Sequence, residues 1–181
     1  MPFDINAFKQ QGLAFGGARA SLFEFILTPP LVISSGDAAE KLTFTCRAAS
    51  IPASTVGQIE VPYFGRKIKL SGDRTFADWS ITVMNDEDYS VRKIFEEWLF
   101  VLNSHVENKR TADFNSYKTD SMVNHHGKDG EIINSYTFIG LFPTEVSAMD
   151  LDWNTTNTIQ TFTVNLAYDY WISTLNAPGI I

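Results

Sequence analysis

The sequence predicts a mainly β protein with one prominent amphipathic helix, and three observations support this fold class. Several segments alternate apolar and polar residues with the period of two that half-buried strands show. One segment near the middle of the chain has the period of an amphipathic helix instead. Hydrophobic residues make up 44% of the chain and charged residues 19%, which is a globular composition. Because the chain has 181 residues, we expect residues 1–181 to form a single domain with its own core.

Alternating and apolar runs predict strands along the whole chain. A short apolar run at residues 21–27 must end at Pro29–Pro30, since proline interrupts a strand. In the strand predicted at residues 41–47, the apolar face consists of Leu42, Phe44 and Cys46. Further strands are predicted at residues 64–72, within residues 73–84, at residues 131–140, which Gly140 and Pro143 end, and at residues 161–171.

The strand at residues 161–171 has the clearest division between two faces. The apolar face comprises Phe162, Val164, Leu166, Tyr168 and Tyr170, and the other face comprises Thr161, Thr163, Asn165, Ala167 and Asp169. A long strand with two such faces belongs to a sheet that the core covers on one side only.

The predicted helix begins near Asp88 and ends at Leu102. Its apolar residues follow the spacing of a single stripe, namely Val91, Ile94, Phe95, Trp98, Leu99 and Leu102. Full burial of each large apolar side chain stabilises by roughly 1.5–3 kcal/mol, which is enough to dock the helix on a sheet. Just before the helix, Asn85 or Asp86 is placed to cap the amides of the first turn. We therefore interpret the acidic run NDED as a helix start rather than as a catalytic site.

Two segments are predicted to leave the compact body. The polar region from Asn103 to Gly130 has no sustained period, and we interpret it as a long loop or an extended hairpin arm. A second, shorter excursion spans Ile51 to Gly57, and its candidate contact residues are Ile51, Pro52, Ala53, Ser54, Thr55 and Val56.

Charge and composition exclude several classes of protein. The chain has 14 Lys and Arg against 21 Asp and Glu, a formal net charge of −7, which disfavours tight binding of nucleic acid. It does not disfavour a protein that nucleic acid slides past. The one cysteine, Cys46, excludes an intrachain disulfide. We expect no secretory signal and no membrane anchor, because no apolar run approaches the ~20 residues of a membrane helix.

A catalytic or metal site is not expected. The acidic pairs Glu96–Glu97 and Asp150–Asp152 come with no second element that marks a cleft. The pair His125–His126 has no Cys or His spacing typical of a metal site, so we interpret it as part of a solvated loop. The chain contains no nucleotide-binding or nucleophile motif. We therefore expect no enzyme and no cofactor.

Long stretches of the chain resemble the tail tube proteins of T-even-type contractile-tailed bacteriophages. They are TFTCRAASIPASTVGQIEVPYFGRKIKL, GDRTFADWSITVMNDEDYSVRKIFEEW and LFPTEVSAMDLDWNTTNTIQTFTVNLAYDYW. This resemblance implies a β-sandwich or barrel-like domain of two packed antiparallel sheets with a flanking α-helix. It also implies hexameric rings that stack into a hollow tube inside a contractile sheath and conduct genomic DNA during ejection. Related rings form the inner tubes of type VI secretion and other contractile injection systems.

The resemblance further implies partners and a place in the particle. The partners would be other copies of the chain, the tail sheath protein, a baseplate initiator, the tape measure protein and a tail terminator. The tube would be assembled in the host cytoplasm and become part of the virion. On this basis, the side chains predicted to face a water-filled lumen are Thr161, Thr163, Asn165, Ala167 and Asp169. Residues 51–57, the region from Asn103 to Gly130 and both termini are the predicted contacts between rings.

Two alternatives remain at this point. One is the inner tube of an injection device that delivers protein effectors instead of DNA. The other is a β-sandwich carbohydrate-binding module, which requires exposed aromatic side chains on one concave face. The contexts of Trp79, Trp98, Trp153 and Trp171 predict core-facing or strand-end positions, and this disfavours the carbohydrate-binding module.

Overall fold

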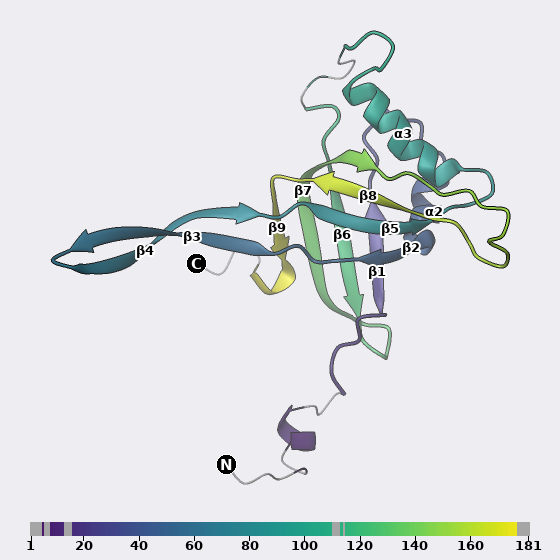
Figure 1. Ribbon diagram of the computed structural model, residues 1–181. Helices are drawn as coiled ribbons and strands as arrows, with labels where there is room; N and C mark the ends of the chain where they lie inside the picture. Colours follow the sequence, from purple (N-terminus) through teal and green to yellow (C-terminus); the bar gives the residue numbers. More distant parts are fainter. Residues whose placement is uncertain (1–4, 6–7, 13–15, 110–112, 114, 177–181) are drawn as a thin grey trace.

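The computed structural model describes residues 5, 8–12, 16–109, 113 and 115–176. Antiparallel strands dominate these residues, and two helices pack against them (Figure 1). The strands are β1 (Phe23–Leu27), β2 (Cys46–Ala49), β3 (Ser54–Tyr63), β4 (Arg66–Phe76), β5 (Trp79–Met84), β6 (Thr119–His126), β7 (Ile132–Val146), β8 (Thr161–Ala167) and β9 (Tyr170–Ser173). The helices are α2 (Ala38–Thr45) and α3 (Ser90–Leu102), and two short helical segments are η1 (Phe8–Gly12) and η2 (Thr174–Asn176).

Two sheets share the 15-residue strand β7. The first part of β7 pairs with β6 on one side and β9 on the other, and β1 pairs with β6; we call this the first sheet. The last part of β7 pairs with β8, which is followed by β5 and β2; we call this the second sheet. Strands β3 and β4 form a separate two-stranded hairpin. This arrangement confirms the predicted mainly β fold with packed antiparallel sheets.

Strand β7 passes from the first sheet to the second at Gly140. Gly140 has a φ of +70°, a conformation that glycine adopts without the steric penalty of a Cβ atom. Its N–H donates to Oδ1 of Asp120 at 3.0 Å. The carbonyl oxygen of the preceding residue, Ile139, accepts a hydrogen bond from the N–H of Asp169 at 2.9 Å. The bend is therefore fixed from both β6 and the connection between β8 and β9.

The core lies between the two sheets and under helix α3. The ring of Trp79 stacks on Phe138 with centroids 3.8 Å apart, and Phe25 meets Trp79 edge-on at 5.4 Å. Helix α3 contributes Phe95, which meets Phe162 edge-on at 6.4 Å. The predicted stripe of α3 lies on this side: Val91, Ile94, Phe95 and Trp98 are buried, and Leu99 and Leu102 are half-buried.

Part of the strand predicted at residues 41–47 is instead helix α2. Ala38 and Leu42, four residues apart, are buried together, whereas Phe44, predicted on the same apolar face as Leu42, is 83% exposed. The strand prediction was wrong because three alternating residues are too few to distinguish a strand from a helix whose stripe includes every fourth residue. Strand pairing begins only at Cys46.

The predicted last strand is two strands in different sheets. Strand β8 ends at Ala167, and β9 pairs with β7 in the first sheet. Asp169 lies in the connection, exposed, and its carboxylate pairs with Nζ of Lys118 at 2.7 Å. The sequence predicted that Asp169 shares the outer face of β8 with Thr161, Thr163 and Asn165, and this prediction was wrong. The alternation continues through the break, so a period of two carries no signal of the change of sheet.

The two predicted excursions also differ from the structure. Residues 54–57, predicted as a loop, belong to β3. The region from Asn103 to Gly130, predicted as a long loop or an extended hairpin arm, contains β6, which is a strand of the first sheet. Strand β7 continues past Gly140 and Pro143, because Gly140 bends the chain and Pro143 lies on an edge, in register with Leu166. Predictions were confirmed for a strand at residues 21–27, within which β1 lies, and for strands in β4 and β5.

Replacing Gly140 by alanine should destabilise the fold by roughly 1–2 kcal/mol, since an L side chain is strained at positive φ. The added Cβ would also come within 2.9 Å of Cγ of Asp169. The free energy of unfolding measured with urea is the readout. Gly57→Ala is the matched control, because a Cβ atom there meets only an ordinary contact at 3.4 Å; equal stability of the two variants would contradict the role of Gly140.

Candidate assembly interface

The hairpin of β3 and β4, which we call the arm, is exposed along almost its whole length. Each of the ten residues of β3 is exposed, and the arm projects from the body like a handle (Figure 1). The two strands pair from Ser54 opposite Phe76 to Tyr63 opposite Arg66. An isolated two-stranded hairpin is marginally stable in water at best, so an arm of this length needs a further surface to cover it.

One face of the arm is apolar. Ile59, Val61 and Tyr63 alternate along β3 and so point to the same side. Ile68 and Leu70 lie opposite Val61 and Ile59 in the register and extend that side across β4. These five side chains are 41–62% exposed. Exposed apolar faces of this kind are typical of contact surfaces.

The tip of the arm holds a strained aromatic residue. Phe64 and Gly65 connect the two strands with φ values of 39° and 81°, which is the sign required by a two-residue type I′ turn. A bulky residue at positive φ is unfavourable by of order 1–3 kcal/mol. Phe64 is nevertheless 92% exposed and meets only the edge of Tyr63 here. Its strain is not offset by burial within this subunit.

The root of the arm is anchored to the body. The ring of Phe76 packs against Tyr168 and Trp171, with centroids 6.1 and 6.3 Å apart. The hydroxyl of Tyr168 donates to the carbonyl oxygen of Ala77 at 2.7 Å. Of the predicted contact residues 51–56, Pro52 is buried and the other five are exposed, so this segment forms the root on the side of β3. The arm is thus held at its base and free along its length.

The outer face of the second sheet is uncharged along its central strands, and all the residues named here except Met84 are polar. Thr161, Thr163 and Asn165 alternate with the buried residues of β8 and are half-buried. Their neighbours on β5 in the register are Met84, Thr82 and Ser80. At the side of β7, Glu145 accepts a hydrogen bond from Nδ2 of Asn165 at 2.8 Å.

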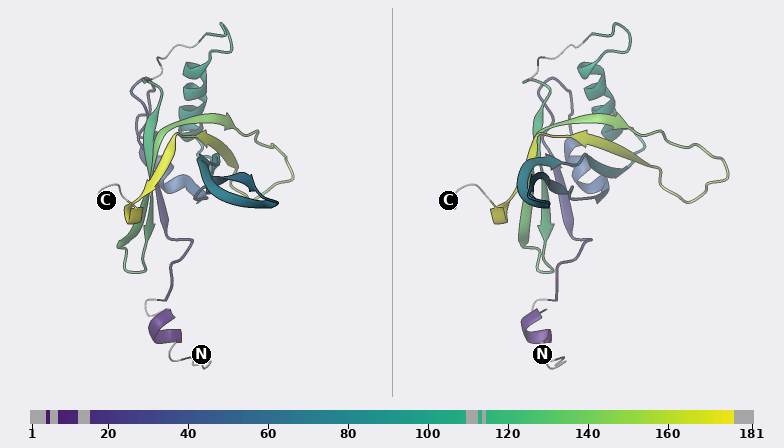
Figure 2. Two further views of the ribbon diagram at one scale, coloured as in Figure 1. Left: turned by 90° about the vertical axis from the view of Figure 1, so that its left-hand side faces the viewer. Right: turned by 60° about the vertical axis from the view of Figure 1, so that its left-hand side comes forward.

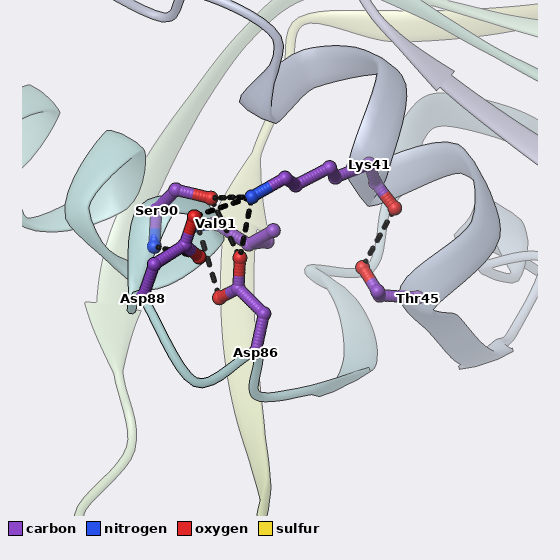
Figure 3. Close-up of polar contacts among 6 residues, drawn as sticks. All are labelled: Lys41, Thr45, Asp86, Asp88, Ser90 and Val91. Carbon is purple, nitrogen blue, oxygen red and sulfur yellow. Dashed lines mark hydrogen bonds and ion pairs between the residues drawn. The ribbon is translucent and has the colours of Figure 1, made fainter.

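A polar network joins helix α2 to the start of α3 (Figure 3). Nζ of Lys41 lies 2.5 Å from Oδ2 of Asp88 and 3.4 Å from Oδ2 of Asp86. The hydroxyl of Ser90 donates to Asp86 at 2.6 Å, and the N–H of Val91 donates to the same carboxylate at 3.5 Å. Tyr89 occupies the N-cap position and its side chain does not cap. The carboxylate of Asp86 instead accepts the hydrogen bond from the N–H of Val91 in the first turn, as predicted for Asp86, whereas Nδ2 of Asn85 donates to Gln160. Asp86 and Asp88 therefore lie at the start of α3, as predicted, and also link α3 to α2 through Lys41.

The network shifts the pKa of two of its members. The side chain of Asp86 and then the ammonium group of Lys41 hold the pKa of Asp88 well below its usual range. The hydrogen bond to Asp88 in turn raises the pKa of Lys41. Both groups are exposed, so solvent screens the effect on stability.

The remaining candidate groups are structural. The thiol of Cys46 is buried, and burial raises its pKa to about 12, as for an inert small hydrophobe. His125 and His126 lie in β6 rather than in the predicted loop, with Nε2 of His126 3.5 Å from Glu24. Within the described residues, no group of three or more His, Cys, Asp or Glu side chains is arranged to hold a metal ion. None of the helices described is long and apolar enough to cross a membrane.

The four tryptophans do not share one environment. Trp79 and Trp98 are buried and Trp171 is half-buried, but Trp153 is fully exposed, so the predicted position of Trp153 was wrong. Trp153 lies in the connection between β7 and β8, outside both strands. The local sequence MDLDWNTTNT gave the signal that was missed, since polar and turn-forming residues surround the tryptophan.

Comparison with known proteins decides the family. The model of the phage tail tube protein family matches residues 18–174. The chain belongs to the phage tail tube protein family. Tail tube protein gp19 of Enterobacteria phage T4 is 39% identical over 133 residues, which are 73% of this chain and 82% of that relative. The tail tube protein of Serratia phage KSP90 is 23% identical over 165 residues, or 91% of this chain and 93% of that relative.

Solved structures of the same fold come from injection particles. The cap that terminates the tube of the anti-feeding prophage has a TM-score of 0.62 at 18% identity, over 87% of this chain and 90% of that chain. A chain of the sheath–tube complex of an extracellular contractile injection system has a TM-score of 0.56 at 15% identity, over 94% of this chain and 97% of that chain. At these identities the likeness shows the fold alone.

Family membership confirms three predictions. The chain is a structural, non-enzymatic tail tube subunit of a contractile-tailed phage, and its place is the virion tail. A carbohydrate-binding module is thereby excluded as the main function, although Trp153 has the exposure that such a module would need.

Replacing Lys41 by methionine should weaken the pH dependence of stability. Because Asp88 has a lower pKa in the folded chain than its ordinary value of 3.8, its contribution to stability is present above pH 3.8 and is lost as the pH falls through the folded pKa. The loss in free energy of unfolding between pH 7 and pH 3 should therefore be smaller in Lys41→Met than in the wild type. Lys93→Met, which removes only the exposed pair with Glu97, is the control, and an equal loss in both variants would contradict the role of Lys41.

Proposed function

We propose that six copies of this chain form a ring, and that rings stack into a hollow tube that conducts genomic DNA inside a contractile sheath. The observation that carries the proposal is the arm, a two-stranded hairpin with an exposed apolar face. Burial of that face between copies would stabilise the assembly at about 25 cal/mol per Å² of apolar surface. It would also supply the contact that offsets the strain at Phe64.

Unpaired strand edges support closure into a ring. Among the described residues, strand β1 pairs with β6 alone and β2 with β5 alone, so each sheet ends in an edge strand. Exposed edges invite pairing with other chains, and full closure of sheets around a common axis removes them. In the proposed ring, neighbouring subunits cover these edges, and residues 51–56 at the root of the arm lie between rings.

The outer face of the second sheet suits a lumen through which DNA passes. Thr161, Thr163 and Asn165 offer hydrogen-bonding groups without positive charge, and Glu145 beside them is an acid. Six copies at a formal net charge of −7 carry −42 per ring. At moderate salt, the interaction between exposed charges is largely screened beyond about 8–10 Å. Only acids near the lumen therefore repel phosphate. Such a wall lets a duplex slide without binding it. Ala167 ends β8, and Asp169 leaves this face, so we no longer place Asp169 with these residues.

The remaining partners follow from the tube. A sheath protein would surround it, a baseplate initiator would nucleate it, a tape measure protein would set its length and a terminator would close it. Structures with this fold occur in a sheath–tube complex, a tube-terminating cap and a baseplate of other particles. An effector-delivering tube remains the alternative function; the identity of 39% to a phage relative favours DNA conduction.

Electron microscopy of the purified chain at high concentration should show rings and tubes with a central channel.

Phe64→Asn should fold at least as well as the wild type, because asparagine is favoured at positive φ in this turn, but should form fewer tubes. Thermal unfolding separates the two effects. Tubes as abundant in Phe64→Asn as in the wild type would contradict a contact at the tip, and a wild type that stays monomeric would contradict the proposal as a whole.

Cysteines placed on the outer face of β8 should react with a thiol reagent only through the lumen. Thr163→Cys or Asn165→Cys, assembled into tubes, should be labelled when the tube is open and protected when its ends are plugged. Lys128→Cys, in the exposed turn between β6 and β7, is the control for general access. Equal labelling of Thr163→Cys with and without the plug would refute the placement of β8 in the lumen.

A further inference from the structure

The connection between β7 and β8 presents a second exposed apolar surface. Residues 150–159, which we call the acidic loop, are exposed throughout. Leu151 is 83%, Trp153 100% and Ile159 66% exposed. Large aromatic side chains contribute most to interfaces when they are buried, since each covers 150–250 Å². A fully exposed tryptophan in a loop with two further exposed aliphatic residues is typical of a contact surface.

The acidic loop holds its tryptophan in a defined turn. Oδ1 of Asp152 accepts hydrogen bonds from the N–H and from Nδ2 of Asn154, at 2.9 and 3.0 Å. The N–H of Thr155 donates to the carbonyl oxygen of Asp152 at 3.1 Å. These contacts close a turn around Trp153. A backbone turn held in this way loses less conformational entropy on docking than a free loop.

The arm and the acidic loop are complementary in charge and polarity. Residues 54–76 of the arm contain four basic and two acidic side chains, a net charge of +2, whereas the acidic loop contains Asp150 and Asp152 and no base, a net charge of −2. Arg66 alternates with Ile68 and Leu70 along β4, so its charge lies on the apolar face of the arm. Each surface thus offers apolar side chains together with the charge that the other lacks.

The two surfaces extend from opposite sides of the body. In Figure 1 the arm extends to one side of the sheets and the acidic loop to the other, and the right-hand view of Figure 2 shows the loop well clear of the body. The arm of one copy therefore cannot reach its own acidic loop. A contact between them must join different copies head to tail, and such heterologous contacts build rings or helical filaments rather than closed dimers.

We propose that the acidic loop of one subunit is the docking site for the arm of another copy of this chain, with Trp153 packed on the apolar face of the arm and Asp150 near Arg66. The inference deepens the proposed tube assembly and depends on it. The proposed function does not say which surface of the neighbouring copy contacts the arm, and this inference assigns that surface to the acidic loop.

Cross-linking within assembled tubes tests the proposal. A variant with Ile68→Cys on the arm and Thr155→Cys beside Trp153 is assembled and treated with a short bifunctional maleimide. The buried thiol of Cys46 should not compete. Head-to-tail contact predicts a ladder of dimers, trimers and longer species on a denaturing gel. The control pairs Ile68→Cys with Lys128→Cys and should remain monomeric on the gel.

The possible results separate this inference from the proposed function. Tubes without a ladder, or with equal ladders in both variants, would overturn the docking site and leave the tube intact; the acidic loop would then be free to contact the sheath or another protein. A wild type that forms no tubes would overturn both.

A charge exchange gives an independent readout if the cysteine variants fail to assemble. Arg66→Glu and Asp150→Lys should each reduce the yield of tubes several-fold, and the two changes in one chain should restore it. The matched control combines Arg66→Glu with Lys128→Glu, which should not restore it. No restoration by Asp150→Lys would overturn the contact.

Discussion

The bend of β7 at Gly140 is the constraint on which the rest of the structure depends. A single strand serves both sheets, so the two sheets are linked covalently. Two hydrogen bonds fix the bend: the N–H of Gly140 donates to Asp120, and the N–H of Asp169 donates to the carbonyl oxygen of Ile139. With this corner fixed, the stacked rings of Trp79 and Phe138 lie between the sheets, and helix α3 closes the open side. The body can therefore be rigid although large surfaces remain uncovered.

That rigid body carries two projections that it does not itself cover. The arm is fixed at its root through Phe76 and Tyr168, and the acidic loop is shaped by its own turn at Asp152. In both cases the backbone is ordered while apolar side chains face solvent. This combination is unfavourable in a monomer and is typical of a subunit whose core is completed by neighbours. The subunit fold and the proposed assembly are consequences of the same incomplete burial.

The sequence predicted the elements that local periodicity determines. The stripe of α3 and the alternation of β8 were readable because each packs one continuous face against the core. The helix α2 was missed because its alternating run is short, and the change of sheet at Asp169 left no break in the period. The arm was predicted only in part, because β3 and β4 are exposed on both faces and no core imposes a pattern on them. The periodic pattern of apolar residues arises from burial in the core. Surfaces that a partner covers are therefore the hardest to predict from the sequence.

Trp153 shows how this limit extends to function. In the sequence it is one of four tryptophans, and hydrophobicity alone places all four in or near a core. Its polar, turn-forming neighbours in the sequence distinguish it from Trp79 and Trp98, and the structure shows that the core buries those two. Trp153 is exposed and lies close in sequence to Asp150 and Asp152, and both features support the proposed contact with the basic and apolar arm of another copy. The prediction of a core-facing or strand-end position for Trp153 was therefore wrong, and the surface that we propose to cover this residue is the arm of another copy.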